Sequence, residues 1–316
     1  MATLSRTFQS NSRPIIHRFL LLFLLMALVS PLSAAFKDVG WGVRPEGMGG
    51  AFAAVANDAN AVAYNPAGSS LMEASEVSFA YSRPYVGFVE DQNIGMFYTS
   101  YAKSLRRYSG YGAAWASLSS PSLKEDALIL NASVNAGRVM KWGRDVIVGA
   151  NAKRMTRSFK VDDKSASDPV FRGGTDNTLY SYDFGSWIRP LPLQYPGASF
   201  GLVLKNLTQP DAGLRTEDII PMEIVAGGAY QRGNVLFTMD FSRRDGVQVF
   251  RGGSEIAFFD RKVTARFGLN SYNGSFGMSY HQPFTRFSIA VDYAFIMPFY
   301  IEDSAGSHRI SLALKR

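Results

Sequence analysis

The residues best suited to chemistry are His281 and His308, because hydrolysis or acyl transfer needs a nucleophile beside a general base. Ser307 and Ser311 lie near His308 in the sequence. Both histidines fall near the ends of predicted strands, where a histidine is typical of a turn or an interface. The sequence contains no cysteine, which leaves little for thiol or structural zinc chemistry. We therefore expect no enzyme activity and no cofactor.

Two further patterns are weak candidates for binding sites. Asp162, Asp163 and Asp168 could form a calcium site, but a solvated acidic loop explains them better. The glycines at 47–50 follow no strand and lack the Lys-Ser/Thr pair of a phosphate-binding loop, so nucleotide binding is not expected. The sequence predicts no metal site.

Charged residues on the small-residue face of several predicted strands are more informative. They are Asp240, Glu255, Arg266, Asp292 and Arg309. An Arg or Lys that faces lipid at mid-depth costs about 2–4 kcal/mol, so these side chains should point into a lumen. They could form a polar conduction path, or they could form a lattice of salt bridges that braces a barrel around its contents. We favour the lattice.

Alternating hydrophobicity is the main structural signal in these strands. In residues 286–295, Phe287, Ile289, Val291, Tyr293 and Phe295 alternate with polar or small residues. Turn residues separate fourteen such segments. The predicted strands are 77–85, 93–103, 110–119, 127–137, 145–159, 178–189, 198–206, 222–231, 234–242, 247–259, 262–270, 272–281, 286–295 and 308–315.

One predicted strand, 247–259, changes the parity of its apolar residues at Gly252-Gly253. A glycine bulge would shift the phase of the strand, so we predict a bulge there, with a turn between two short strands as the alternative. The sequence also predicts tight turns at Gly143-Arg144, Arg232-Gly233, 243–245 and Asp260-Arg261. Long polar loops are expected at 160–177, 207–221 and 297–307. Short turns at one end and long loops at the other are typical of an outer-membrane barrel.

Two all-β architectures fit this alternation, a secreted soluble sandwich and a transmembrane barrel. The segments have the 9–11 residues that a spanning strand needs. Their second face is rich in small residues and carries few charges, which suits a crowded lumen better than solvent. Aromatic residues near segment ends suit interfacial girdles. They are Tyr98, Tyr101, Trp115, Trp142, Trp187, Phe295, Phe299 and Tyr300. The sequence therefore predicts an all-β, transmembrane antiparallel β-barrel of about 14 strands.

The N-terminal segment is typical of a secretory signal peptide. Residues 1–35 contain Arg6, Arg13 and Arg18 but no acid, followed by an apolar run over 19–29 and then Ser33-Ala34-Ala35. We predict cleavage near residue 35 and location in a bacterial outer membrane, with membrane lipids as surroundings. The net charge is +7, and removing three arginines leaves +4, so nucleic acid is not an expected partner.

Residues 47–68 are neither a regular helix nor a regular strand. Three glycines occur in the first four positions, small residues follow, and Asn65-Pro66-Ala67-Gly68 has the composition of a turn. We predict that residues 36–74 form a plug inside a barrel built from residues 75–316. Its apolar residues would line any binding site for a hydrophobic molecule, and they are Met48, Phe52, Val55, Val62, Tyr64, Leu71 and Met72.

Three stretches of this plug, 47–52, 57–62 and 64–68, resemble the N-terminal hatch of the FadL-like outer-membrane proteins. That family includes transporters of long-chain fatty acids and hydrocarbons and the PorV/PorQ-type proteins of type IX secretion. Residues 201–207, 291–295 and 308–312 resemble the PorV-like branch. The resemblance implies a fourteen-stranded barrel, with Asn65, Pro66 and Ala67 as the hatch turn before the first strand. It also implies passive transport or binding of hydrophobic small molecules. The alternatives are a binding role with secretion-system proteins, or a structural plugged porin.

Overall fold

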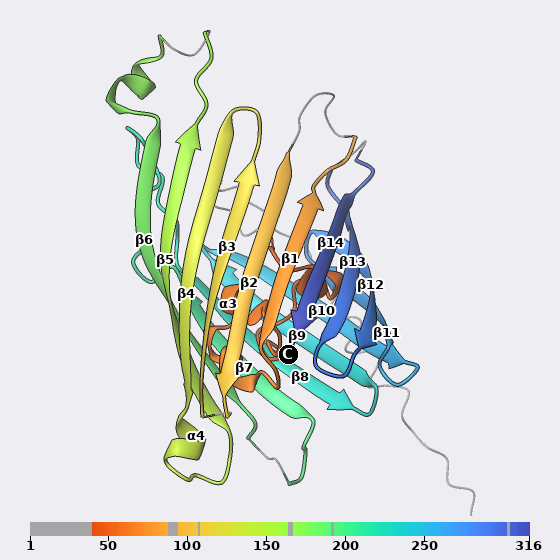
Figure 1. The fold of residues 1–316 in the computed structure, drawn as a ribbon. Helices are drawn as coiled ribbons and strands as arrows, with labels where there is room; N and C mark the ends of the chain where they lie inside the picture. The colour runs from red at the N-terminus through yellow and green to blue at the C-terminus, as the bar shows by residue number, and fades with distance from the viewer. Residues whose placement is uncertain (1–39, 88–93, 107, 164–166, 191–192, 302–303) are drawn as a thin grey trace, which may run out of the picture. The chain divides into compact units, whose positions relative to one another are not determined.

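The computed structural model describes residues 40–87, 94–106, 108–163, 167–190, 193–301 and 304–316, which belong to one compact unit. Within these residues, fourteen strands form a closed barrel in which every strand pairs antiparallel with its sequence neighbours, and β1 pairs with β14 (Figure 1). The prediction of a fourteen-stranded antiparallel barrel is therefore confirmed. The predicted signal peptide lies outside the described residues.

The strands agree closely with the fourteen alternating segments of the sequence. In chain order they are β1 Glu76–Arg83, β2 Gly95–Leu105, β3 Ser109–Ser119, β4 Leu123–Asn135, β5 Val146–Phe159, β6 Asp176–Ile188, β7 Ala198–Lys205, β8 Glu223–Arg232, β9 Val235–Arg244, β10 Val247–Phe258, β11 Val263–Asn270, β12 Asn273–Pro283, β13 Ser288–Pro298 and β14 Ser307–Lys315.

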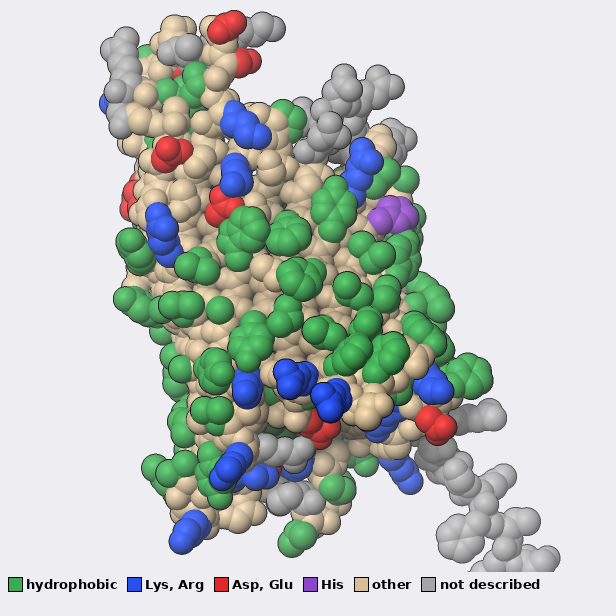
Figure 2. Space-filling view, viewed as in Figure 1, with side chains coloured by type: hydrophobic (Ala, Val, Ile, Leu, Met, Phe, Trp, Pro, Cys, Tyr) green, Lys and Arg blue, Asp and Glu red, His purple; other side chains and the backbone are tan. Residues whose placement is uncertain are grey.

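Strand β9 illustrates how the alternation divides the wall into two faces. Phe237 and Met239 point outward and are each 59% exposed, whereas Thr238 and Asp240 between them are buried. On the face of the molecule that Figure 2 shows, the outward hydrophobic side chains form a broad belt across the wall. Because apolar side chains face outward and small polar ones face inward, the barrel is inverted relative to a soluble protein.

The predicted bulge at Gly252-Gly253 is wrong, and so is the alternative of a turn there. Strand β10 is continuous and keeps one register with β9, from Val247↔Arg244 to Ile256↔Val235. A Cβ at Gly253 would lie 2.5 Å from the carbonyl oxygen of Met48, so this glycine provides room for the plug. The parity changes because Val247 and Val249, which begin β10 after the turn from β9, share the lumen-side face with Gly253 and Glu255.

The connections at the two ends of the barrel differ in length. The two longest, 160–175 and 206–222, lie at the end we call the loop end, which also carries 299–306 and the short 3-10 helix η2 (Pro169–Gly173). The opposite end, the turn end, carries helix α4 (Ala136–Val139) where a tight turn at Gly143-Arg144 was predicted. The tight turn predicted at 243–245 lies at the loop end, between β9 and β10.

Two of the predicted girdle aromatics have another role. Tyr98 and Trp187 are buried on the inner side of the wall, whereas Trp115, Trp142 and Tyr300 are exposed. In the described part of the chain, no helix is both long enough and apolar enough to cross a membrane.

The N-terminal plug consists of α2 (Val43–Gly47), α3 (Ala61–Tyr64) and the 3-10 helix η1 (Pro66–Leu71), joined by turns. Figure 1 shows this segment inside the ring of strands. Glycines of the wall allow it to approach closely. A Cβ at Gly149 would lie 2.3 Å from the carbonyl oxygen of Pro66, and one at Gly110 would lie 2.3 Å from the backbone of Ser69. Backbone packs on backbone at these positions, which only glycine permits.

Candidate functional site

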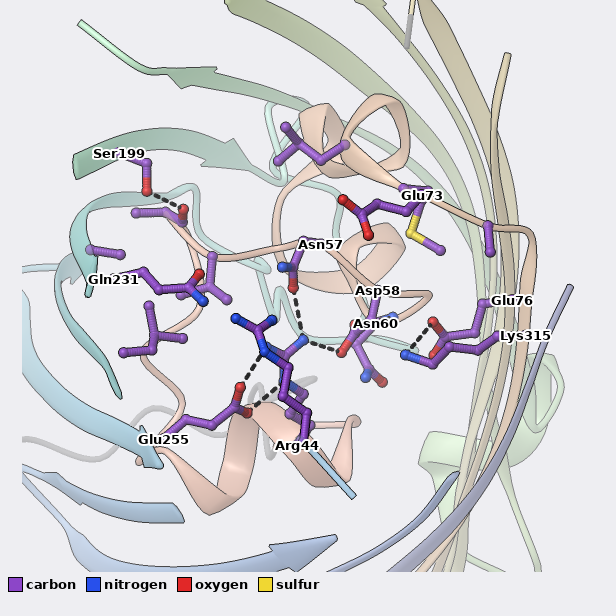
Figure 3. A pocket seen from close by; sticks show the side chains of 18 of the residues that line it. Arg44, Asn57, Asp58, Asn60, Glu73, Glu76, Ser199, Gln231, Glu255 and Lys315 are labelled. Atoms are coloured by element: carbon purple, nitrogen blue, oxygen red, sulfur yellow. Dashed lines mark hydrogen bonds and ion pairs between the residues drawn. The ribbon is translucent and has the colours of Figure 1, made fainter. Parts of the chain in front are cut away.

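Arg44 of helix α2 is the centre of the polar contacts between plug and wall. Its Nε and Nη2 donate to the two carboxylate oxygens of Glu255 on β10, at 2.9 and 3.1 Å, and its Nη1 donates to Asp58 at 2.9 Å. Asn57 accepts a further bond at 2.8 Å, as Figure 3 shows. Burial alone would lower the pKa of Arg44, but the carboxylates of Glu255 and Asp58 outweigh it and raise that pKa above its usual range.

Glu255 connects this arginine to the other predicted lumen charges. It also accepts from Arg266 Nε at 2.7 Å, and Arg266 Nη1 donates to Asp292 at 2.8 Å. The result is a chain of alternating charge that runs from the plug to β10, β11 and, across β12, to β13. These charges point inward and are partnered with one another, as the lattice hypothesis requires. Attraction between the two cations, Arg44 and Arg266, and the three carboxylates of Asp58, Glu255 and Asp292 offsets most of the free-energy cost of removing these charges from water.

Asp240 and Arg309, the other two predicted lumen charges, bind the plug backbone instead of this chain. Asp240 Oδ2 accepts from the amides of Phe52 and Ala53 at 2.8 and 2.9 Å. Arg309 donates to the carbonyl of Gly40 and lies 3.8 Å from a carboxylate oxygen of Glu46. Three of the five predicted charges, Asp240, Glu255 and Arg309, therefore bind the plug, each at a different place.

The hatch turn is held by its amide side chain. Asn65 is fully buried, donates to the carbonyls of Ala53 and Ser186 at 2.7 and 3.0 Å, and accepts from the amide of Ala67 at 3.0 Å. The following carbonyl, of Pro66, accepts from Asn131 of β4 at 3.0 Å. The turn is thus attached to the wall by two side chains, Asn65 on the plug and Asn131 on the wall.

The predicted apolar lining is divided between packing and cavity. Met48, Phe52 and Val62 are completely buried in contacts with the wall and the rest of the plug. Phe52 meets Tyr64 edge-on, with ring centroids 5.5 Å apart. The remaining predicted residues, Val55, Leu71 and Met72, face a cavity.

This cavity, of about 690 Å³, lies between the plug and the turn end of the barrel. Its walls are mainly polar and carry both signs of charge, including Arg44 and Asp58 from the plug and Lys315 from β14, which pairs with Glu76 at 3.1 Å (Figure 3). The cavity is therefore a polar vestibule on the turn side of the plug, unlike the apolar lining that the sequence predicted.

An interruption of the wall lies on the loop side of the plug, between β6 and β7. Only Phe184–Ile188 of β6 pair with β7, although β6 begins at Asp176. Residues 206–222, which we call the seam loop, lie against the part of β6 that does not pair with β7. The amide of Leu207 donates to the carbonyl of Tyr182 at 2.9 Å, and Thr208 Oγ1 donates to the carbonyl of Tyr180 at 3.0 Å.

Apolar side chains lie on both sides of this interruption. On the lumen side, Ala212 and Ile220 of the seam loop pack against Met155 and Leu179. The outer surface at the same place exposes a group of large apolar residues, namely Tyr180, Tyr182, Phe200, Leu202, Leu207 and Ile219. An ion pair from β5, Arg157 to Asp218 at 2.7 Å, and two hydrogen bonds from Asn177 to the carbonyls of Asp211 and Gly213 hold the loop against the lumen wall.

The sequence prediction missed the plug's own charges, although a signal was present. Between residues 39 and 72 the only charged residues are Arg44, Glu46 and Asp58. Charges in a segment expected to be buried must find partners. These three residues could therefore have been predicted to bind lumen charges, although the sequence does not say which ones.

Comparison with known proteins supports the fold. No protein-family model matches the sequence, and no curated protein matches it significantly. Among solved structures, the toluene transporter TodX of Pseudomonas putida has a TM-score of 0.63 at 12% identity, covering 89% of this chain and 99% of that one. The toluene transporter TbuX of Ralstonia pickettii has a TM-score of 0.61 at 13% identity, covering 89% and 99%. A Pseudomonas aeruginosa FadL homologue has 0.56 at 12%, covering 87% and 97%. The chain thus has a FadL-type barrel fold, and identities this low show the fold alone.

Proposed function

We propose that this chain is an outer-membrane channel that passively transfers small hydrophobic molecules, such as monoaromatic or fatty-acid-like compounds. The observation that supports it best is the interrupted β6–β7 ladder, where apolar residues of the lumen and of the lipid-facing wall meet across the seam loop. A hydrophobic solute gains free energy by leaving water for such surfaces. The structural similarity to proteins named as toluene transporters supports the same class of solute.

In this proposal the turn end faces the periplasm, because short turns lie on that side in bacterial barrels. The solute enters at the loop end, contacts the apolar cluster of Met155, Leu179 and Ile220, and exchanges with lipid beneath the seam loop. The plug blocks straight passage, since its backbone touches wall glycines on several strands. The polar vestibule on the turn side of the plug is a poor environment for such a solute, which favours the lateral route.

A disulfide across the seam tests this route. The chain has no cysteine, so the pair Tyr182→Cys and Leu207→Cys can be introduced without competing thiols, at residues whose backbones are already hydrogen-bonded. Uptake of a labelled monoaromatic compound by cells or proteoliposomes should fall in the oxidised variant and recover after reduction. A matched pair, Phe267→Cys with Phe276→Cys on the continuous β11–β12 ladder, should leave uptake unchanged. Equal uptake by both oxidised variants would contradict a route through the seam.

A binding role in protein secretion is the second candidate, supported by the resemblance of residues 201–207, 291–295 and 308–312 to PorV-like proteins. Phe52→Arg distinguishes the two functions, because it places a charge in the fully buried contact between plug and wall. Altered uptake with normal secretion would favour the channel. Lost secretion with unchanged uptake would favour the assembly role.

A further inference from the structure

The connections at the turn end combine large apolar side chains with Lys or Arg. Helix α4 and its following turn expose Val139, Met140 and Trp142 around Lys141 and Arg144. The same combination recurs around the barrel. The other exposed apolar residues are Leu105, Tyr108, Leu193, Tyr195, Tyr230, Phe258, Phe259, Phe284 and Phe287. The other exposed basic residues are Arg106, Arg138, Arg232, Arg261, Lys262, Arg286 and Arg316. We call these basic residues, with Lys141 and Arg144, the turn rim.

Charge is strongly polarised between the two ends. Among the described residues, the only exposed acids at the turn end are Asp260 and Glu73. The loops and adjoining strand ends on the opposite side expose more acids than bases. The acids are Asp162, Asp163, Asp168, Asp176, Asp211, Glu217 and Asp245, and the bases are Arg83, Lys160, Arg215 and Arg243. Figure 2 shows Lys and Arg side chains gathered below the hydrophobic belt. The turn rim is therefore a property of one end, not of the whole surface.

The turn rim also lies at a definite depth relative to the apolar belt. The lipid-facing row of β14 ends with Leu314, and Arg316 follows two residues later. Two residues of extended chain span roughly 7 Å. Between β10 and β11, Arg261 lies in the same compact turn as Phe259. The headgroup layer on each side of the hydrocarbon core is roughly 5–8 Å thick, so these cations reach it directly.

The side-chain chemistry identifies what this layer should contain. Trp, Tyr and Phe prefer the interface between hydrocarbon and water, while Lys and Arg bind phosphate. A soluble acidic protein would match the charges, but it would not explain why apolar residues accompany them on connections all round the barrel. Anionic phospholipid headgroups match both features.

We propose that the turn rim binds anionic phospholipids in the leaflet that borders the turn end, and thereby fixes the depth of the barrel in the membrane. This inference rests on the membrane location in the proposed function, but not on transport. Each Lys or Arg close to an anionic surface strengthens the attraction about fivefold, so several together should select phosphatidylglycerol or cardiolipin over zwitterionic lipid.

Native mass spectrometry of the detergent-purified barrel tests this selection directly. The wild-type protein should retain phosphatidylglycerol at concentrations at least tenfold below those needed for phosphatidylcholine. The turn-rim variant is Lys141→Gln, Arg144→Gln, Lys262→Gln and Arg286→Gln. The matched control at the loop end, Arg83→Gln, Lys160→Gln, Arg215→Gln and Arg243→Gln, removes the same charge. The turn-rim variant should lose the preference, while the control keeps it within about twofold.

Equal losses in both variants, or no preference in the wild type, would overturn the proposal. An acidic protein that is lost from the turn-rim variant while phosphatidylglycerol retention stays normal would also overturn it, in favour of a protein partner. If the fourfold variant fails to fold, as judged by heat-modifiable migration, Lys141→Gln with Arg144→Gln gives the same test on the turn after helix α4 alone. In nanodiscs, the fluorescence quenching that is lost on Trp142→Phe is expected with brominated phosphatidylglycerol, but not with brominated phosphatidylcholine. Equal quenching by the two lipids would count against selective binding.

Discussion

Replacing Arg44 by methionine should loosen the plug without disturbing the barrel. The substitution removes the cation that joins Glu255 to Asp58, both of which are mostly buried. Breaking a buried ion pair from one side costs about 3–5 kcal/mol. Because Glu255 keeps its bond to Arg266 at 2.7 Å, we expect the low end of this range, about 3 kcal/mol. That corresponds to about a 150-fold shift in the equilibrium between the seated and the released plug.

Hydrogen exchange at the amides of Phe52 and Ala53 measures this shift, since both bind Asp240 only while the plug is seated. Their exchange should accelerate strongly in Arg44→Met, whereas amides of the wall should keep their rates. Arg83→Met, which removes an exposed arginine on β1, is the matched control and should have no effect.

A double-mutant cycle with Asp58→Asn separates the ion pair from lost packing. Asp58 Oδ2 lies 2.9 Å from Arg44, and Asp58 Oδ1 accepts from the amide of Asn60. The two substitutions should therefore couple by at least about 1 kcal/mol. Unchanged exchange in Arg44→Met, or a coupling below about 0.5 kcal/mol, would show that apolar packing alone holds the plug and would refute the ion-pair account.

Three further predictions concern other parts of the molecule. Gly185→Ala places a Cβ 2.3 Å from the side-chain oxygen of Asn65, and should displace the plug at a cost of about 1–3 kcal/mol. Gly228→Ala, where the nearest atom lies at 3.5 Å, should be nearly neutral in denaturant unfolding. Asp145 follows α4, and burial would raise its pKa, but hydrogen bonds from an asparagine and an arginine outweigh this and lower it. The ionised Asp145 carboxylate therefore stabilises the fold above about pH 4, and this stabilisation is lost as the pH falls through the lowered pKa of the folded state. Hydrogen exchange at the amides of the α4 turn should accelerate on acidification. The acceleration should be smaller in Asp145→Asn. Arg157→Met removes the cation that holds the seam loop, and should increase protease cleavage in that loop while leaving the barrel intact.

The strands could be predicted from the sequence because the alternation of apolar and polar residues within each strand reflects the different surroundings of its two faces. In β9 and β13, for instance, every second residue faces lipid and its neighbours face the lumen, so the pattern repeats locally. The bulge prediction failed for the complementary reason. Gly253 is required by the plug, which lies about 200 residues earlier in the chain, as the 2.5 Å approach to Met48 shows, whereas a Cβ at Gly252 would meet only the carbonyl oxygen of Leu269 at 4.0 Å. Local periodicity carries no record of such a contact.

The sequence by itself determined the barrel, a strand number of about 14, and the expectation that Asp240, Glu255, Arg266, Asp292 and Arg309 point inward. It did so because lipid outside and a crowded lumen inside impose opposite requirements on alternate residues. Only the tertiary structure decided which charges meet, that Arg44 joins the plug to the wall, and that the β6–β7 ladder is interrupted. Those features depend on how the closed ring brings distant segments together, and a pairing across 211 residues, such as Arg44 with Glu255, leaves no periodic trace in either segment.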